Sequence, residues 1–221
     1  MNIAGFLPPS LLAERLEELA YLYSRADAAV AVFAEGSGIS CPGGCGMCCE
    51  SFVPDILPLE AAYIATFLAG IDRDLAFRIA AEGVQARVRS DGQTGCPLYR
   101  DESIYHCGIY EARPLVCRMF AFSAVRGKNG EPMFSVCRHG EYGLGARLLT
   151  GKGLVEVFGL EPPVIADMGS ELVAIDPSSS GGRKALPEAL AEASGLVLFL
   201  IGMNDRKDDD PDLQPPIPRA G

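Results

Sequence analysis

The feature that most constrains this chain is a run of four cysteines within nine residues, CPGGCGMCC at positions 41–49. The two-residue gap between Cys45 and Cys48 allows a tight turn to present both thiolates to one metal ion. The intervening glycines permit positive φ angles and leave backbone N–H groups free to hydrogen-bond the sulfurs. Cys48 and Cys49 are adjacent, and adjacent side chains diverge. We therefore expect one of these two cysteines to bind a second ion, to bridge two ions, or to lie outside the ligand shell and contact the ligands.

The chain carries no sequence signal for export or for a membrane span. Residues 1–9 have neither a basic start nor a long apolar run. The most apolar stretch, residues 195–203, has nine residues, whereas a helix needs about 20 to cross a bilayer. We therefore expect a cytoplasmic, reduced protein with no membrane partner. In that compartment metal ligation or redox chemistry explains eight cysteines better than disulfides do.

Composition limits the partners further. An apolar fraction of 48% is enough for a sizeable core, and the formal net charge of the chain is −10. Because nucleic acids are polyanions, an acidic surface disfavours nonspecific binding to them. We expect a metal ion as the partner and no nucleic acid, and the sequence names no protein partner.

The other four cysteines are dispersed along the chain, at Cys96, Cys107, Cys117 and Cys137. Four clustered and four dispersed thiols are compatible with two tetrahedral sites. One cluster held by four cysteines and supported by the other four is the alternative. Ligation by thiolates alone suits Zn²⁺ and iron–sulfur clusters alike. One tight knuckle combined with distant ligands slightly favours an iron–sulfur cluster or a two-metal site over a zinc ribbon, which is built on two knuckles.

A longer motif surrounds the dispersed cysteines. The chain reads CGIYEARPLVCRMF from Cys107 to Phe120, after a Cys96-Pro97 pair and before Cys137. Together with the first run, these residues resemble the YkgJ family of zinc- or iron-chelating proteins, which has a CxxCxxCC signature. The family's C-x-I-Y-E-x-R-P-x-x-C-R-x-F block is present in full. The resemblance covers about residues 41–140 and departs once, because three residues rather than two separate Cys41 from Cys45.

The resemblance implies metal binding and leaves the biochemical role undefined. A related cysteine domain occurs in flagellin lysine N-methylases, which implies a link to methyl transfer or to iron–sulfur chemistry. The residues that it implies as metal ligands are the eight cysteines: Cys41, Cys45, Cys48, Cys49, Cys96, Cys107, Cys117 and Cys137.

Charged residues inside the second motif are candidates to support the ligands. Several thiolates close together carry more negative charge than a site of low dielectric tolerates, and a metal neutralises most of it. Arg113 and Arg118 are candidates to offset the rest by donating hydrogen bonds to sulfur or to Glu111. The alternative is that both arginines form surface ion pairs.

The aromatic and imidazole side chains near the cysteines have simpler expected roles. We expect Tyr110 and Phe120 to pack around the site. His106 and His139 each lie close to a cysteine, and either could be a ligand or a proton donor. The sequence favours surface histidines.

Periodicity predicts a mainly α fold with a small irregular β-hairpin, that is, a metal-stapled cysteine-cluster domain with helical extensions. Apolar residues recur every three or four positions from Ser10 to about residue 35, which is typical of an amphipathic helix. Further helices are expected at 58–70, from the Asp72 cap to about 91, at 110–120 and at 186–203. The hairpin is expected at 120–136 with its turn at 128–130.

The same pattern divides the chain into four parts. These are an N-terminal helix at 1–40, a cysteine-cluster metal-binding domain at 41–147 and a C-terminal extension with a helix at 148–203. An acidic, proline-rich tail at 204–221 is expected to be disordered.

Three functions remain open from the sequence. The metal could be structural and hold together segments that cannot bury enough surface alone. An iron–sulfur or two-metal centre could perform redox or group-transfer chemistry, or exposed thiolates could deliver metal as a chaperone does. No paired carboxylates, Ser-His pair or cofactor-binding loop indicates an enzyme, so enzyme status stays open.

Overall fold

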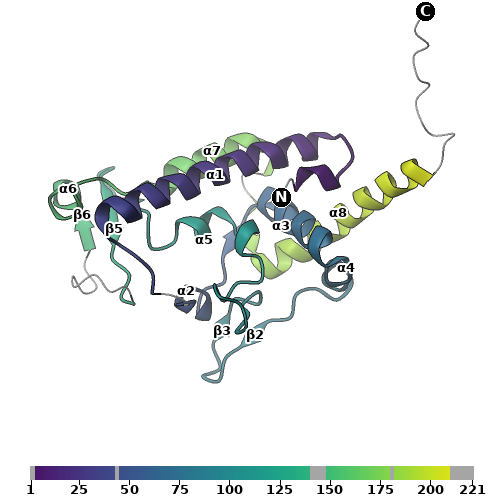
Figure 1. The fold of residues 1–221 in the computed structure, drawn as a ribbon, viewed down its shortest axis with the longest axis horizontal. Coiled ribbons are helices and arrows are strands. Elements are labelled where there is room, and N and C mark those ends of the chain that lie inside the picture. The colour runs from purple at the N-terminus through teal and green to yellow at the C-terminus, as the bar shows by residue number, and fades with distance from the viewer. Residues whose placement is uncertain (1–2, 43–44, 140–147, 180–181, 210–221) are drawn as a thin grey trace, which may run out of the picture.

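The computed structural model describes residues 3–42, 45–139, 148–179 and 182–209 of the 221-residue chain. Helices dominate it and small antiparallel sheets complete it, so the predicted mainly α fold is confirmed (Figure 1). Helices α1 (Leu11–Ser37) and α7 (Ile165–Ile175) lie side by side along one edge of the molecule. The short helix α2 (Met47–Glu50) lies at the opposite edge, next to strands β2 (Arg87–Val88) and β3 (Thr94–Gly95).

The first predicted helix is confirmed as α1. The Ser10 side chain accepts a hydrogen bond from the Ala13 N–H at 3.2 Å and thus caps the helix, which ends before Gly38. The 3₁₀ turn η1 (Ala4–Phe6) precedes it. Of the apolar stripe predicted for α1, Leu16, Leu19, Tyr23, Ala26 and Phe33 are buried, and Leu12 and Val30 are partly buried.

Helices α3 (Pro58–Ile71), α4 (Arg73–Glu82) and α8 (Leu186–Asp209) pack on one another. The prediction for the middle helix was too long. Gly83, at φ 76° and ψ −173°, ends α4, and the following segment forms the β2–β3 hairpin instead. The last helix continues past Met203 to Asp209, so residues 204–209 of the expected disordered tail are helical. Residues 210–221 of that tail lie outside the described residues.

Helix α8 is unusually long and apolar for a chain in which no membrane span was expected. Its residues Leu186–Asp205 are long and apolar enough to cross a bilayer, a test that a buried core helix also passes. The buried face of α8 packs on α3 and α4, with Leu190 and Val197 fully enclosed. Packing therefore accounts for this buried face, whereas Leu196 and Phe199 of the same helix are exposed.

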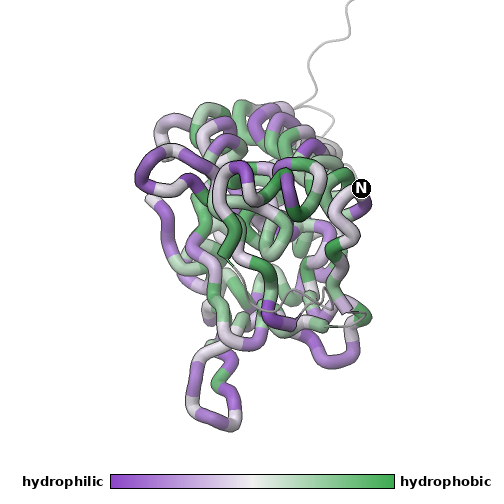
Figure 2. Tube along the Cα trace, turned by 90° about the vertical axis from the view of Figure 1, so that its left-hand side faces the viewer, coloured by the Kyte–Doolittle hydropathy of each residue, from purple (hydrophilic) through white to green (hydrophobic). Residues whose placement is uncertain are grey.

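The strands form three small antiparallel sheets. Strand β1 (Asp55–Ile56) pairs with β7 (Lys184–Ala185), and β2 pairs with β3 in a hairpin that projects from the body and is largely hydrophilic (Figure 2). The predicted hairpin is confirmed as β4 (Val125–Arg126) and β5 (Pro132–Ser135), and β6 (Leu148–Thr150) adds a third strand.

The predicted helix at 110–120 is split by Pro114. A 3₁₀ turn η2 (Tyr110–Ala112) is followed by helix α5 (Leu115–Met119), with Pro114 at its N-cap. Proline cannot donate the backbone hydrogen bond that an uninterrupted helix would require of it. Cys117 therefore lies on a short helix that starts directly after the proline.

Two apolar cores hold these elements together. The larger one runs from Ile3 to Ile201 and includes residues of all three folded parts expected from the sequence. The smaller one lies under the three-stranded sheet and helix α6 (Lys152–Phe158), where Phe33, Phe134 and Phe158 meet edge to face. The 3₁₀ turn η3 (Pro177–Ser179) links α7 to the C-terminal elements.

Candidate metal centre

The first cysteine run folds as a compact knuckle. Cys45 N–H donates to the Pro42 carbonyl at 3.1 Å, and Cys49 N–H donates to the Gly46 carbonyl at 2.9 Å. Gly46 has φ 54° and starts α2, which carries Cys48 and Cys49. This left-handed conformation is one that glycine adopts readily. The glycine in the two-residue gap thus provides the turn between Cys45 and the helix that carries Cys48.

A backbone contact joins the knuckle to the dispersed cysteines. The Cys96 N–H donates to the Cys49 carbonyl at 3.0 Å across 47 residues of sequence (96 − 49). The approach depends on Gly95, because a Cβ there would lie 2.5 Å from the Glu50 carbonyl oxygen. Cys107 then pairs with Tyr99 in an isolated antiparallel bridge. Cys49, Cys96 and Cys107 therefore belong to three segments that meet.

The electrostatics of the thiols place Cys117 and Cys48 in the same group. All eight cysteines are free thiols. Burial, followed by the nearby Cys96 and Cys107, raises the pKa of the Cys117 thiol well above its ordinary value. Burial also raises the pKa of Cys96 and of Cys107, and each of these thiols is close enough to Cys48 to be affected by it.

The Cys48 and Cys49 thiols are in contact and influence each other's pKa. Their sulfurs lie 3.9 Å apart, and this contact lowers the pKa of Cys48 to about 6 while it raises that of Cys49. A thiolate is the form that binds metal, so Cys48 is the knuckle thiol that is ready to bind at neutral pH.

Cys41 belongs to a neighbouring group. Its pKa is raised by burial, and then by Cys45, Cys137 and Cys48 in that order. The late cysteine, which follows strand β5, therefore returns to the start of the knuckle. Cys48 contributes to the surroundings of both groups.

The donor set fits a thiophilic metal. Crowded, partly buried thiols with raised pKa values are the arrangement that a cation would convert to thiolates. Soft sulfur ligands select zinc or iron–sulfur centres over Mg²⁺ or Ca²⁺. Within the described ranges no three Cys, His, Asp or Glu side chains stand together in metal-ligand geometry. The segments that carry the cysteines therefore lie close together, but their sulfurs do not form a closed ligand shell around a metal position.

Arg113 is a cation that acts on several of the thiols. It is among the groups that lower the pKa of Cys107, Cys117 and Cys48, opposing the burial effect. Its Nε donates to the Tyr110 carbonyl at 3.0 Å and its guanidinium lies 3.6 Å from the Tyr110 ring centroid.

The Tyr110 ring is also packed against a second aromatic ring. The Tyr105 ring stacks on it with centroids 3.8 Å apart. This packing holds the Arg113 head group beside the cysteines rather than in solvent.

Arg118 has partners other than the expected sulfur or Glu111 carboxylate. The side chain is 5% exposed and pairs with Asp27 of α1 at 2.5 Å. It also donates to the backbone carbonyls of Arg113, at 2.7 Å, and of Glu111, whose own side chain points to an exposed position. The alternative prediction, a surface ion pair, does not describe Arg118 either, because its side chain is buried. Arg118 fixes the loop between Cys107 and Cys117 onto α1.

A buried carboxylate that the sequence analysis missed positions α5. Glu60 is 1% exposed and accepts hydrogen bonds from Leu115 N–H at 2.9 Å, Leu57 N–H at 3.0 Å and Tyr23 O–H at 3.2 Å. Burial and this carboxylate raise the pKa of Tyr23. The sequence Pro-x-Glu at 58–60 is a recognisable capping signal. The sequence does not reveal the distant hydrogen-bond partners of Glu60. Glu60 caps both α3 and the helix that carries Cys117.

Three other side chains differ from expectation or were missed. His106 is half-buried with its Nδ1 fully buried, and its ring stacks on Tyr99, whereas a surface position was predicted. Phe120 was expected to pack around the site but is 40% exposed, with its ring 5.6 Å from that of Phe52. Arg87, which the sequence analysis did not single out, lies 4.0 Å from the Tyr99 ring centroid.

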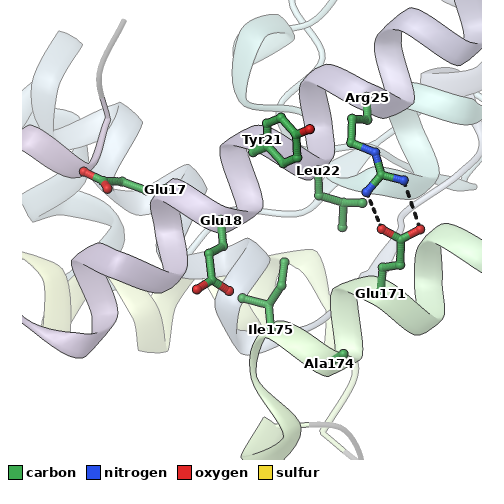
Figure 3. A pocket seen from close by; sticks show the side chains of 8 residues that line it. All are labelled: Glu17, Glu18, Tyr21, Leu22, Arg25, Glu171, Ala174 and Ile175. Carbon is green, nitrogen blue, oxygen red and sulfur yellow. Dashed lines mark hydrogen bonds and ion pairs between the residues drawn. The ribbon is translucent and has the colours of Figure 1, made fainter.

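Among the described residues, a pair of pockets has no cysteine in the lining. A pocket of about 620 Å³ between α1 and α7 carries Glu17, Glu18 and the Arg25–Glu171 ion pair, and no cysteine lines it (Figure 3). A second pocket of about 380 Å³ is lined by Phe52 and by Leu115 and Val116 of α5, so it borders the cysteine segments.

The fold and the cysteine segments define a small, mainly helical protein with a cysteine-rich centre. Residues 40–138 match the model of the CxxCxxCC family, described as a "putative zinc- or iron-chelating domain". This match confirms the family resemblance for that segment, which is less than half of the chain, and supports metal binding. No curated protein and no solved structure matches the chain.

Proposed function

We propose that this protein binds zinc or iron through its cysteines in a reducing, cytoplasmic environment, and that the metal completes a site which the fold has already assembled. The observation that carries the proposal is the hydrogen bond between Cys96 and Cys49. It joins the knuckle to the dispersed cysteines, which are far away in sequence. A cation relieves the crowding of thiols that burial and neighbouring thiols keep protonated.

The electrostatic grouping supports two adjoining sets of ligands. One set is Cys48, Cys49, Cys96, Cys107 and Cys117, and the other is Cys41, Cys45 and Cys137. Because Cys48 affects both, it is the candidate to bridge two metal ions. Closing either shell requires the sulfurs to turn toward a common point, since no closed group of three ligands exists in the described part of the chain.

An iron–sulfur or two-metal enzyme is the second candidate. The pocket of about 380 Å³ beside Phe52 and α5 favours it, because it offers space for a substrate next to the cysteine segments. Arg183 also lines it, with its guanidinium engaged by the Glu60 carboxylate at 3.8 Å and by the Asp55 carbonyl at 3.2 Å. If bound, such a centre would supply redox or group-transfer chemistry.

A metal chaperone is the third candidate. Exposed, exchangeable thiols would serve it, and Cys41 and Cys48 are both exposed. Rapid, reversible loss of metal to mild chelators would distinguish this role from a structural site.

The deciding experiment is metal analysis and an ultraviolet–visible spectrum of protein purified without oxygen. We expect at least one tightly bound zinc or iron per chain. Broad visible absorption would indicate an iron–sulfur cluster, and a colourless zinc protein would indicate a thiolate site. A folded and stable protein without metal would contradict the proposal.

Ligand variants provide a second test. Cys48→Ser and Cys117→Ser should each lose metal and solubility together, because each residue contributes to a shared group of thiols. A Ser24→Ala control changes an exposed hydroxyl of α1 and should leave the metal content unchanged. Normal metal content in both cysteine variants would count against these ligand sets.

A further inference from the structure

Two buried side-chain nitrogens beside the cysteines have no hydrogen-bond partner. They are Arg87 Nη1 and His106 Nδ1, and Ser194 Oγ is the third such atom found among the described residues. Buried polar groups in folded proteins are nearly always paired, so an unpartnered one indicates a missing acceptor or ligand. Both nitrogens belong to groups that contact the same ring, that of Tyr99.

Each of these groups fills the space over a glycine next to a cysteine. A Cβ on Gly46, inside the knuckle, would lie 2.7 Å from His106 Cδ2. A Cβ on Gly95, before Cys96, would lie 2.8 Å from Arg87 Nη1. His106 also directly precedes Cys107. The imidazole and the guanidinium therefore border the same group of thiols from two segments.

The backbone holds His106 in this place at a conformational cost. Its φ of 51° lies in the left-handed region, which residues other than glycine seldom adopt. Two backbone hydrogen bonds maintain it, from His106 N–H to Ser103 at 2.9 Å and from Arg100 N–H to the His106 carbonyl at 3.3 Å. Strained conformations of this kind persist where the surrounding structure imposes them, and they concentrate at functional sites.

The nearby carboxylate does not account for Arg87. Glu50 contacts Arg87 through Nη2 at 3.5 Å and is shared with Arg89 at 3.4 Å, which leaves Nη1 facing the interior unpaired. Stacking on Tyr99 explains how the planes of the guanidinium and the imidazole are oriented. It provides no hydrogen-bond acceptor for either N–H group. An anionic acceptor next to the cysteines would satisfy both.

We infer that Arg87 and His106 are positioning residues whose Nη1–H and Nδ1–H groups donate hydrogen bonds to anionic sulfur of the metal-loaded centre. This inference rests on the proposed metal binding. Donors of this kind lower the charge on sulfur and hold the ligands in place, and removing such a donor typically weakens metal binding by about 10- to 100-fold. The acceptor is either a cysteine thiolate turned by the metal or inorganic sulfide of a cluster.

The test compares His106→Phe with His139→Phe, and Arg87→Gln with Arg89→Gln, in the full chain purified without oxygen. Phenylalanine keeps a ring over Gly46 and against Tyr99 but removes the N–H. His139 is also near a cysteine but has Arg138 as a partner at 3.1 Å, and Arg89 shares Glu50 without an unpaired buried nitrogen. The readouts are metal per chain, the rate of metal transfer to a chromophoric chelator, acid-labile sulfide and helix content by circular dichroism.

We expect His106→Phe and Arg87→Gln to keep the helix content and to release metal about 10- to 100-fold faster than wild type, while the two controls match wild type. Faster release without acid-labile sulfide assigns the acceptor to thiolate, and faster release with it places the donors beside the sulfur of a cluster. Either outcome supports the inference. Wild-type release rates in both His106→Phe and Arg87→Gln would overturn it while metal binding stands. Wild-type protein without metal would overturn the proposed function first.

Discussion

At the scale of single residues, the candidate centre depends on positions where a side chain is absent. Gly46 turns the knuckle at φ 54°, and the His106 ring occupies the space that a Cβ would take. Gly95 lets the segment before Cys96 approach the Glu50 carbonyl. Gly95 is not distinguished by sequence from the other glycines of the chain, because its importance comes from what lies against it.

Gly46→Ala should therefore impair metal binding and stability together. The left-handed conformation costs a residue with a Cβ about 1–2 kcal/mol, and displacement of His106 adds to that. Gly195→Ala is the matched control, because Gly195 lies within α8, where an added Cβ would meet nothing within 4 Å, and this variant should gain about 0.5–1 kcal/mol. Urea unfolding and metal content measure both effects, and equal stability changes in the two variants would contradict the expectation.

The thiol pKa values predict how metal affinity depends on pH. Thiols whose pKa is raised, such as Cys96, Cys107 and Cys117, are protonated at neutral pH and must release protons to bind metal. Cys48, with a pKa of about 6, is already a thiolate there. Affinity should therefore increase as pH rises above 6, by about tenfold per pH unit for each proton displaced. Competition titrations against a chelator at several pH values measure this, and a pH-independent affinity would refute it.

At the scale of elements, buried polar side chains hold α5 against its neighbours. Glu60 of α3 accepts the Leu115 N–H that starts α5, and Arg118 at the end of α5 pairs with Asp27 of α1. Tyr23 of α1 joins the two, since its hydroxyl donates to Glu60 and its ring lies 4.3 Å from the Arg118 guanidinium carbon. The position of Cys117 is thereby linked to α1 and α3.

Glu60→Gln should destabilise the protein by about 1–3 kcal/mol, because an amide cannot accept from all of its three buried donors. Glu17→Gln, at an exposed position of α1, should stay within about 0.5 kcal/mol of wild type. Thermal and urea unfolding provide the measurement. The result to set against this expectation is a Glu60→Gln protein as stable as the Glu17→Gln control.

At the scale of the whole molecule, the matched family segment and the folded unit differ in extent. The match covers residues 40–138, whereas the larger core includes Leu16, Leu19 and Tyr23 of α1 and Leu190 and Val197 of α8. Helix α3, almost fully buried, would expose much of its surface if α1 and α8 were removed. The centre therefore depends on helices that lie outside the match.

A fragment of residues 40–138 should fail to fold with native helix content, because the apolar surface of α3 loses its cover. A chain ending at residue 209 should retain the fold and the metal of the full protein, since the sequence predicts a disordered tail from residue 204 and α8 ends at Asp209. Circular dichroism and metal analysis compare the two. A stable, metal-loaded 40–138 fragment would show that the segment is an independent domain.

The sequence by itself determined the features that depend on neighbours a few residues apart. The cap at Ser10, the glycine turn between Cys45 and Cys48, the hairpin around Gly130 and the cysteine motif itself were all predictable, because capping, turn geometry and ligand spacing are local. Only the tertiary structure decided that Arg118 binds Asp27 and two carbonyls, and that His106 lies buried against the knuckle. These outcomes depend on burial and on partners far away in sequence, and such contacts have no local signal.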